Sequence, residues 1–236
     1  MLMTWISAAV THPGLKRKTN EDSFLDQPER GLWAVADGMG GGRCGEEASR
    51  AIVKALSALE NPRGRPEHIE QSLQHVNYSL YHQSVTTPPY GPMGSTVALL
   101  LTRNDQCRIL WAGDSRVYRY RNKSLKKLSK DHSYVQQLIE QGSITEEEAR
   151  KHPQAHHITK AIGVDVSIEI DSLQVSAKPG DRYLLCSDGL YNELSEAEIA
   201  EQLEQFSIKI ATENLLNLVL SRTASDNITI IIVEFN

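Results

Sequence analysis

Acidic residues lie at the ends of several apolar segments of this sequence. One acid at the end of a strand usually caps a turn, but four such strand ends in one compact sheet can bring carboxylates together. Each is flanked by a small or turn-forming residue, as in LWAVADG, ILWAGD, YLLCSDG and DNITIIIV. The acids are Glu21 and Asp22, Asp37, Asp114, Asp188 and Asp226.

Carboxylates that converge repel one another, which raises their pKa values and destabilises the fold unless cations lie among them. A set of oxygen ligands without His or Cys favours Mg²⁺ or Mn²⁺. Two such ions, ~3.5–4 Å apart, can activate a water and stabilise an in-line displacement at phosphorus. The acids therefore predict metal-dependent phosphoryl chemistry, provided that the strand ends meet.

The elements that must position these acids follow from hydrophobic periodicity and turn residues. Short connections between strands indicate mainly antiparallel pairing. The predicted strands are 6–10, 23–25, 31–36, 95–102, 107–112, 117–121, 168–175, 182–186 and 228–235. The predicted helices are 48–59, 69–80, 132–141, 208–220 and two that begin with capping boxes at Thr145 and Ser195.

The order of these elements lacks the alternating βαβ rhythm of a doubly wound fold. It favours an α+β fold in which antiparallel sheets are covered by helix pairs. Since no linker or repeat divides the chain, we expect a single domain over residues 1–236 with a small helical flap inserted in it.

The composition argues against several classes of function and location. The 236 residues carry 30 acids and 25 bases, a formal charge of -5, so a protein that coats nucleic acid is not expected. The apolar runs Val97–Leu101 and Ile228–Val233 are much shorter than the ~20 residues of a membrane span, and the first residues do not form a secretory signal. Three cysteines without a CxxC pair are typical of the reducing cytoplasm, which is the location we expect.

Six motifs in fixed order carry a resemblance to a known family. Together they resemble the metal-dependent Ser/Thr protein phosphatases of type 2C, and most of all their compact bacterial members, over about residues 14–233. Each motif alone is weak, whereas six in order are specific. They are Arg17-x-x-Asn20-Glu21-Asp22, Asp37-Gly38-Met39-Gly40-Gly41, Gly94-Ser95-Thr96, Gly113-Asp114-Ser115-Arg116, Ser187-Asp188-Gly189 and Asp226-Asn227.

The resemblance implies a four-layer α-β-β-α sandwich and a dinuclear centre of Mn²⁺ or Mg²⁺ at one edge, where a water between the ions attacks phosphorus. By motif position, Asp37 would bridge the two ions, Asp188 and Asp226 would complete one ligand set, and Glu21 and the Gly38 carbonyl would serve the other. Asp114, with Asp188, would hold a third and weaker ion. Asp22 would orient a water, and Arg17 would bind the substrate phosphate.

The family also implies a function and partners. We expect hydrolysis of phosphoserine and phosphothreonine in proteins that a bacterial Ser/Thr kinase has phosphorylated, by a monomer that binds no nucleic acid and is not inserted in a membrane. Residues 130–162 match the family's flap, which lies beside the site and contacts protein substrates. His156 and His157 lie in this flap, and its role in specificity stays open.

Two positions depart from the pattern of the family. Met39 stands where animal members have a His, and Gly42 stands where bacterial relatives usually have one. A side-chain general acid is therefore not assigned.

Two other motifs fit the chemistry less well. Cys44 and Arg50 have the C-x5-R spacing of cysteine-dependent phosphatases, but Glu46 and Glu47 between them would oppose a thiolate and a phosphate. The spacing G-x-G-x-x-G at residues 40–45 matches a dinucleotide fingerprint, but no βαβ series follows it. These glycines are better explained by close passage of the backbone beside the metal site.

Two alternative hypotheses about the function remain open. One is a catalytically inactive phosphatase-like module that binds phosphoproteins, which the intact set of acids disfavours. The other is a metal-dependent phosphodiesterase or nuclease, which the acidic balance disfavours.

Overall fold

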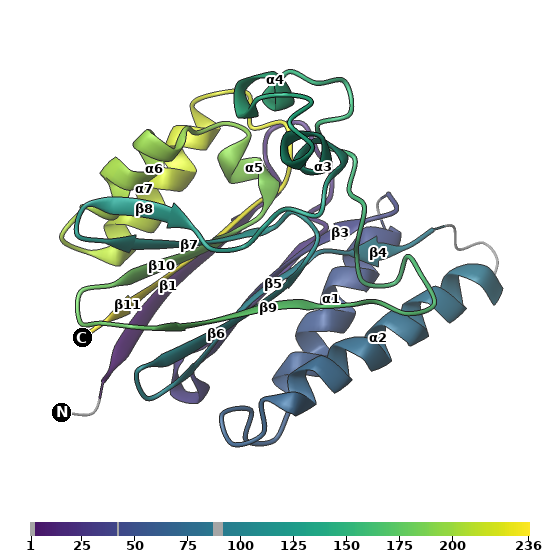
Figure 1. The fold of residues 1–236 in the computed structure, drawn as a ribbon, viewed down its shortest axis with the longest axis horizontal. Helices are drawn as coiled ribbons and strands as arrows, with labels where there is room; N and C mark the ends of the chain where they lie inside the picture. The colour runs from purple at the N-terminus through teal and green to yellow at the C-terminus, as the bar shows by residue number, and fades with distance from the viewer. Residues whose placement is uncertain (1–2, 42, 87–91) are drawn as a thin grey trace.

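A computed structural model describes residues 3–41, 43–86 and 92–236 of the chain. Two antiparallel sheets lie face to face at its centre, and helices cover both outer faces (Figure 1). The predicted α+β, four-layer arrangement is confirmed.

The first sheet has the strand order β1-β11-β10-β7-β8. Its outer face is covered by three helices, which bury Leu190, Ile199 and Leu215 against it. The strands are Trp5–His12 (β1), Arg116–Arg121 (β7), Ser124–Lys127 (β8), Arg182–Cys186 (β10) and Ile228–Phe235 (β11), and the helices are Asp188–Tyr191 (α5), Glu196–Leu203 (α6) and Ile208–Leu220 (α7).

The second sheet has the order β2-β3-β5-β6-β9, with β4 paired to β3. Helices α1 and α2 lie on its outer face (Figure 1). The strands are Asp22–Gln27 (β2), Leu32–Met39 (β3), Gly94–Ser95 (β4), Val97–Arg103 (β5), Gln106–Ala112 (β6) and Asp171–Ser176 (β9), and the helices are Arg43–Ser57 (α1) and Glu67–Thr86 (α2).

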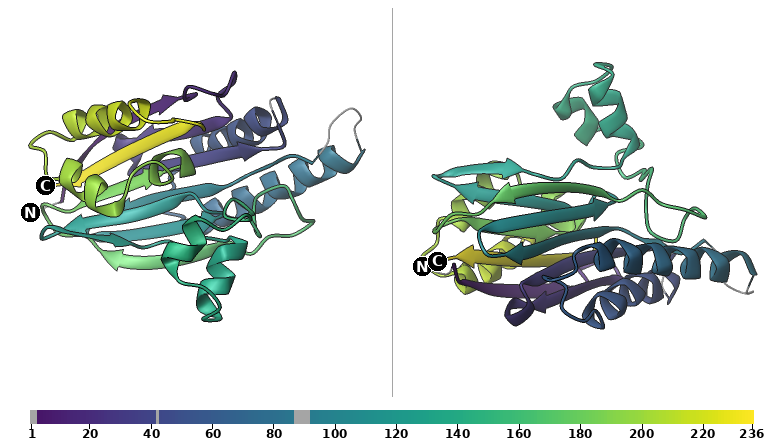
Figure 2. Two further views of the ribbon diagram at one scale, coloured as in Figure 1. Left: turned by 90° about the horizontal axis from the view of Figure 1, so that it is seen from above. Right: turned by 60° about the horizontal axis from the view of Figure 1, so that its bottom comes forward.

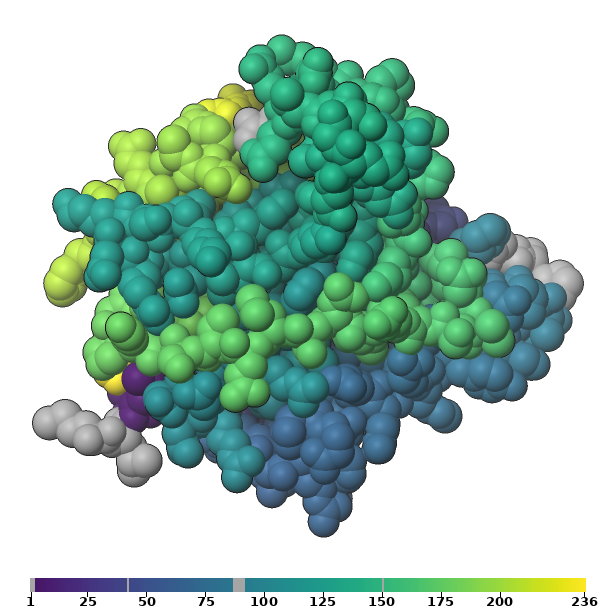
Figure 3. Space-filling view, in the orientation of Figure 1, coloured from purple at the N-terminus to yellow at the C-terminus, as the bar shows by residue number. Residues whose placement is uncertain are grey.

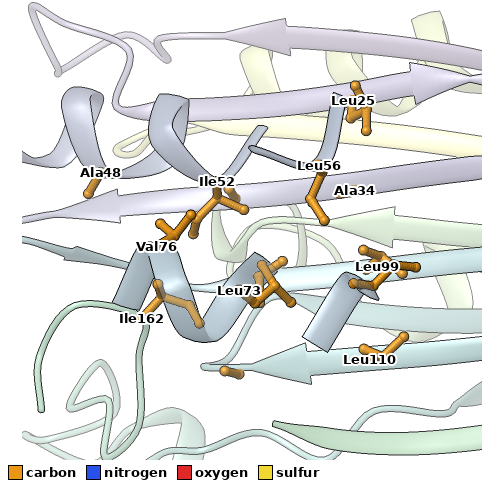
Figure 4. Packing of buried hydrophobic residues seen from close by; sticks show 14 of the residues in the cluster. Leu25, Ala34, Ala48, Ile52, Leu56, Leu73, Val76, Leu99, Leu110 and Ile162 are labelled. Carbon is orange, nitrogen blue, oxygen red and sulfur yellow. The ribbon is translucent and has the colours of Figure 1, made fainter. Parts of the chain in front are cut away.

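Three buried clusters hold these layers together. Ile52 and Leu56 of α1 and Leu73 of α2 pack on Ala34 and Leu99 of the second sheet (Figure 4). A second cluster lies under α5–α7, and a third lies between the sheets and contains Trp33, Tyr183 and Phe235. Burial of apolar surface on both faces of both sheets stabilises the sandwich.

The flap follows β8 and contains the helices α3 (Tyr134–Glu140) and α4 (Glu146–Arg150). It projects from the sandwich (Figure 2). Both predicted capping boxes are confirmed, because Thr145 and Ser195 each accept a hydrogen bond from the backbone of a Glu whose side chain bonds back.

Candidate metal centre

Asp22 joins the two sheets at one end of the sandwich. It begins β2 in the second sheet, and its Oδ2 accepts hydrogen bonds from Ser187 Oγ and Thr229 Oγ1, both at 2.7 Å. Ser187 directly follows β10 and Thr229 belongs to β11, so both donors lie on or at the end of strands of the first sheet. The strand ends that carry the predicted acids therefore meet.

Asp37 lies at the same end of the sandwich and is fixed through its backbone. Its N–H donates to Thr96 Oγ1 at 3.0 Å, and Thr96 N–H donates to its carbonyl at 2.9 Å. Thr96 Oγ1 lies 2.6 Å from Ser115 Oγ. The motifs around Thr96 and Ser115 therefore hold the aspartate of a third motif in place.

Two glycines allow the backbone to pass closely beside Glu21. A Cβ on Gly38 would lie 2.1 Å from the Gly45 carbonyl oxygen, and a Cβ on Gly45 would lie 1.9 Å from Glu21 Oε2. Side chains at either position would collide with this packing. The expectation that glycine permits a close backbone approach holds for Gly45, whereas Gly42 lies outside the described residues.

Asn227 connects the loop that carries Arg17 to the site. Its Oδ1 accepts from the Glu21 N–H at 2.8 Å, and its Nδ2 donates to the carbonyls of Pro13 and Thr19 at 2.9 and 3.0 Å. In this arrangement Arg17 Nη2 lies 2.7 Å from Asp226 Oδ2.

The convergence has an electrostatic cost. Burial raises the pKa of Asp37 well above its ordinary value, and the neighbouring charges of Asp22, Asp188, Asp114 and Asp226 raise it further. Burial followed by repulsion from Asp114 and Asp226 also raises the pKa of Asp188. Burial raises the pKa of Asp22 and that of Asp114 to about 6 each.

Two buried carboxylate oxygens that lack hydrogen-bond partners among the described residues bear on whether this cluster of acids suits a cation. Oδ1 of Asp22 and Oδ1 of Asp114 are buried without a hydrogen-bond partner among the described residues. Buried polar atoms are almost always satisfied, and oxygens that repel one another and lack donors suit a hard divalent cation. The residues fit the predicted ions.

No three described Asp, Glu, His or Cys side chains form a ready-made ligand set. Asp226 faces Arg17 instead, and Asp188 Oδ2 accepts from Asn192 Nδ2 at 3.0 Å. One oxygen of each of these two carboxylates is therefore paired with a polar or charged side chain.

Several groups beside the acids have no function that the sequence motifs imply. Thr229 and Asn227 support Asp22 and Glu21, and Tyr191 Oη donates to the Asp114 carbonyl at 2.9 Å. His156 Nδ1 of the flap lies 3.9 Å from Asp188 Oδ2. Only the pairing of sheets with distant loops brings these groups together, and no local motif encodes it.

The C-x5-R segment forms no phosphate loop. Cys44 and Arg50 both belong to helix α1, and Arg50 Nη2 lies 2.6 Å from Glu46 Oε1. A regular helix does not curve its backbone N–H groups around an anion.

Comparison with known proteins agrees with these motifs. The family described as protein phosphatase 2C matches residues 16–222. The serine/threonine protein phosphatase PstP of Mycobacterium tuberculosis is 34% identical over 230 residues, which are 96% of this chain but 44% of PstP. This chain thus spans less than half the length of that relative.

Other relatives match over nearly their whole length. The serine/threonine phosphatase stp of Listeria innocua is 32% identical, with 96% of this chain and 94% of that protein covered. The structure of PppA, described as a key regulatory component of T6SS in Pseudomonas aeruginosa, is 37% identical and has a TM-score of 0.90, with 100% of this chain and 99% of that chain covered.

A structure of the PstP catalytic domain contains two manganese ions. It has a TM-score of 0.90 at 32% identity and covers 99% of both chains. In the described part of the present chain, no helix is long and apolar enough to cross a membrane. On the family match and these identities, the chain belongs to the protein phosphatase 2C family.

Proposed function

We propose that this protein hydrolyses phosphoserine and phosphothreonine in proteins, using divalent metal ions. The observation that carries the proposal is the convergence of Asp22, Asp37, Asp114, Asp188 and Asp226 at one end of the sandwich, with orphaned carboxylate oxygens. Membership of the protein phosphatase 2C family supports the same reaction.

We assign the acids to ligand sets in the way that the motifs imply. Asp37, the Gly38 carbonyl, Glu21, Asp188 and Asp226 would hold two Mn²⁺ or Mg²⁺ ions, and Asp114 with Asp188 would hold a weaker third. When bound, such ions supply Lewis acidity that activates water and neutralises phosphate charge.

Two side chains act directly on the reactants. The Arg17 guanidinium, which now pairs with Asp226, is half-exposed beside the cluster. It binds the substrate phosphate through its planar set of donors. Asp22 is anchored through Oδ2 by Ser187 and Thr229, so its unpartnered Oδ1 is left to accept a hydrogen bond from a water and to orient it.

The biological setting is part of the proposal. The substrates are phosphoproteins of a bacterial Ser/Thr kinase, whose signal the enzyme reverses. We infer a cytoplasmic location, which the free thiols of Cys44, Cys107 and Cys186 support. We also infer a monomer in which residues 1–236 form one catalytic domain and residues 130–162 form its flap.

Turnover of p-nitrophenyl phosphate and of a phosphothreonine peptide tests the proposal. Activity is expected with Mn²⁺, and it should disappear with EDTA and survive in the Cys44→Ser variant. Activity that resists EDTA but disappears in Cys44→Ser would show a thiol enzyme instead. Absence of turnover while Mn²⁺ is bound would show an inactive binding module.

A further inference from the structure

A groove of about 550 Å³ separates the flap from the core. One wall belongs to the flap and includes Val135, Ile139 and Glu146, and the other wall includes Leu194 and Glu196 at the start of α6. The flap and the yellow-green helices of the core lie on either side of this region at the top of the space-filling view (Figure 3).

The groove is continuous with the proposed metal centre. Asp114 and His156 both line it. Asp114 is one of the proposed metal ligands. Asp188 is another, and its Oδ2 lies 3.9 Å from His156 Nδ1. A peptide whose phosphorylated residue occupies the centre can therefore extend directly into the groove.

Among the charged side chains that line the groove, acids outnumber lysines and arginines six to three. Its three basic residues are already paired: Arg116 and Lys127 with Asp131, and Arg222 with Glu198. Four acids in its walls have no ion pair with a described basic side chain. They are Asp114, Glu146, Glu193 and Glu196.

At the inner end of the groove lies Asp114, which is also a proposed ligand of the weaker third ion. Asp114 is only 6% exposed, and its Oδ1 has no hydrogen-bond partner among the described residues. A buried carboxylate oxygen in this state is costly unless a positive charge approaches it. The exposed Glu146 and Glu196 extend the same negative potential along opposite walls.

We propose that this flap groove binds the peptide segment that flanks the phosphorylated residue, and that it selects substrates with Lys or Arg within a few residues of that position. The inference rests on the proposed phosphatase function and names its substrate class. The apolar side chains of Val135, Ile139 and Leu194 contact the aliphatic stems of such residues, while the glutamates bind their charged ends.

Three phosphothreonine peptides that differ only in their flanking residues, which are Lys, Ala or Glu, test this inference. At saturating Mn²⁺, the kcat/KM of the Lys peptide should exceed that of the Glu peptide about five- to tenfold, as expected for one or two exposed charge pairs. The preference should weaken as ionic strength rises, because salt screens exposed charges.

Charge changes in the groove should alter this preference. We expect the Glu146→Gln/Glu196→Gln variant to reduce the ratio of Lys to Glu peptide, and Glu146→Lys/Glu196→Lys to invert it. A matched control, Glu201→Lys/Glu213→Lys, makes the same change in net charge at exposed residues outside the groove. It should retain the wild-type ratio.

The outcomes separate the two proposals. Equal rates on all three peptides, or a Lys preference that survives charge reversal in the groove, would overturn the inference while turnover of p-nitrophenyl phosphate upholds the phosphatase. Absence of turnover of every substrate with Mn²⁺ bound would overturn both.

Discussion

Asp22 and Asp37 lie directly opposite each other in the antiparallel pair of β2 and β3. Like charges in this position destabilise a sheet. The pKa of Asp22 is raised to about 6 by burial, and the pKa of Asp37 is raised well above its usual range by burial and by the charge of Asp22. The sequence thus places a repulsive pair where an apolar pair would give a more stable fold.

The metal-free protein should become more stable as pH falls from 7.5 to 5. The folded pKa values of these acids exceed their unfolded values, so the folded state binds protons more tightly, and stability is gained as pH falls through about 6. Urea unfolding in EDTA should show a gain of ~1–3 kcal/mol. Asp37→Asn should be more stable than wild type at pH 7.5 and should lose much of the pH dependence. Stability that rises with pH over this range would contradict the account.

Gly38 and Gly45 should respond differently to alanine. At Gly38 the new Cβ meets backbone oxygens at 2.1 and 2.6 Å, so the backbone must shift, and we expect a loss of stability of ~2–4 kcal/mol. At Gly45 it meets the far end of the Glu21 side chain at 1.9 Å and the Gly38 backbone only at 2.9 Å, so the fold should survive while Mn²⁺ affinity falls. Thermal unfolding and calorimetric Mn²⁺ titration separate the two. If the two alanine variants changed thermal stability equally and Mn²⁺ affinity equally, this assignment would be refuted.

Arg17→Ala should raise the KM for a phosphopeptide about ten- to a hundredfold, because a charge-assisted contact to phosphate is lost. Mn²⁺ affinity should not fall, since Arg17 now pairs with Asp226, a proposed ligand. Arg17→Lys should restore KM only in part, because an ammonium lacks the planar donor geometry. Steady-state kinetics at saturating Mn²⁺ would show an unchanged KM if Arg17 had only a structural role.

Thr229→Val should destabilise the protein by ~1–3 kcal/mol at pH 7.5, because Asp22 Oδ2 loses one of its two buried donors. The penalty should shrink at pH 5, where Asp22 becomes protonated. Thr229→Ser keeps the hydroxyl and should behave like wild type. A penalty that does not depend on pH would indicate lost packing rather than lost support for the carboxylate.

Most of the fold could be predicted from hydrophobic periodicity, because buried strands such as Ile228–Phe235 are long and apolar. The short edge strand β8 was missed, since SLKK is polar and only partly buried. Helix α5 was missed because its four residues are too few for a periodic pattern. The predicted strand at 168–175 begins instead at Asp171, and Ile168 packs in the buried cluster under α1 and α2.

The acids of the candidate site could be named from the sequence, but their arrangement could not. Motif order places Asp37 and Asp188 at strand ends, whereas the pairing of Arg17 with Asp226 and the approach of His156 to Asp188 depend on how distant loops pack. These contacts arise from tertiary structure, so periodicity and motif spacing carry no information about them. Ligand roles remain predictions for the same reason.

The central claim is that these acids form a metal centre for phosphoester hydrolysis. It is tested most directly by the turnover of a phosphothreonine peptide as Mn²⁺ is titrated into the EDTA-treated wild type and into Asp37→Asn. We predict no turnover without metal, saturable activation of the wild type, and a loss of at least about 100-fold in the folded variant. Full activity in EDTA, or wild-type activation of Asp37→Asn, would contradict the account.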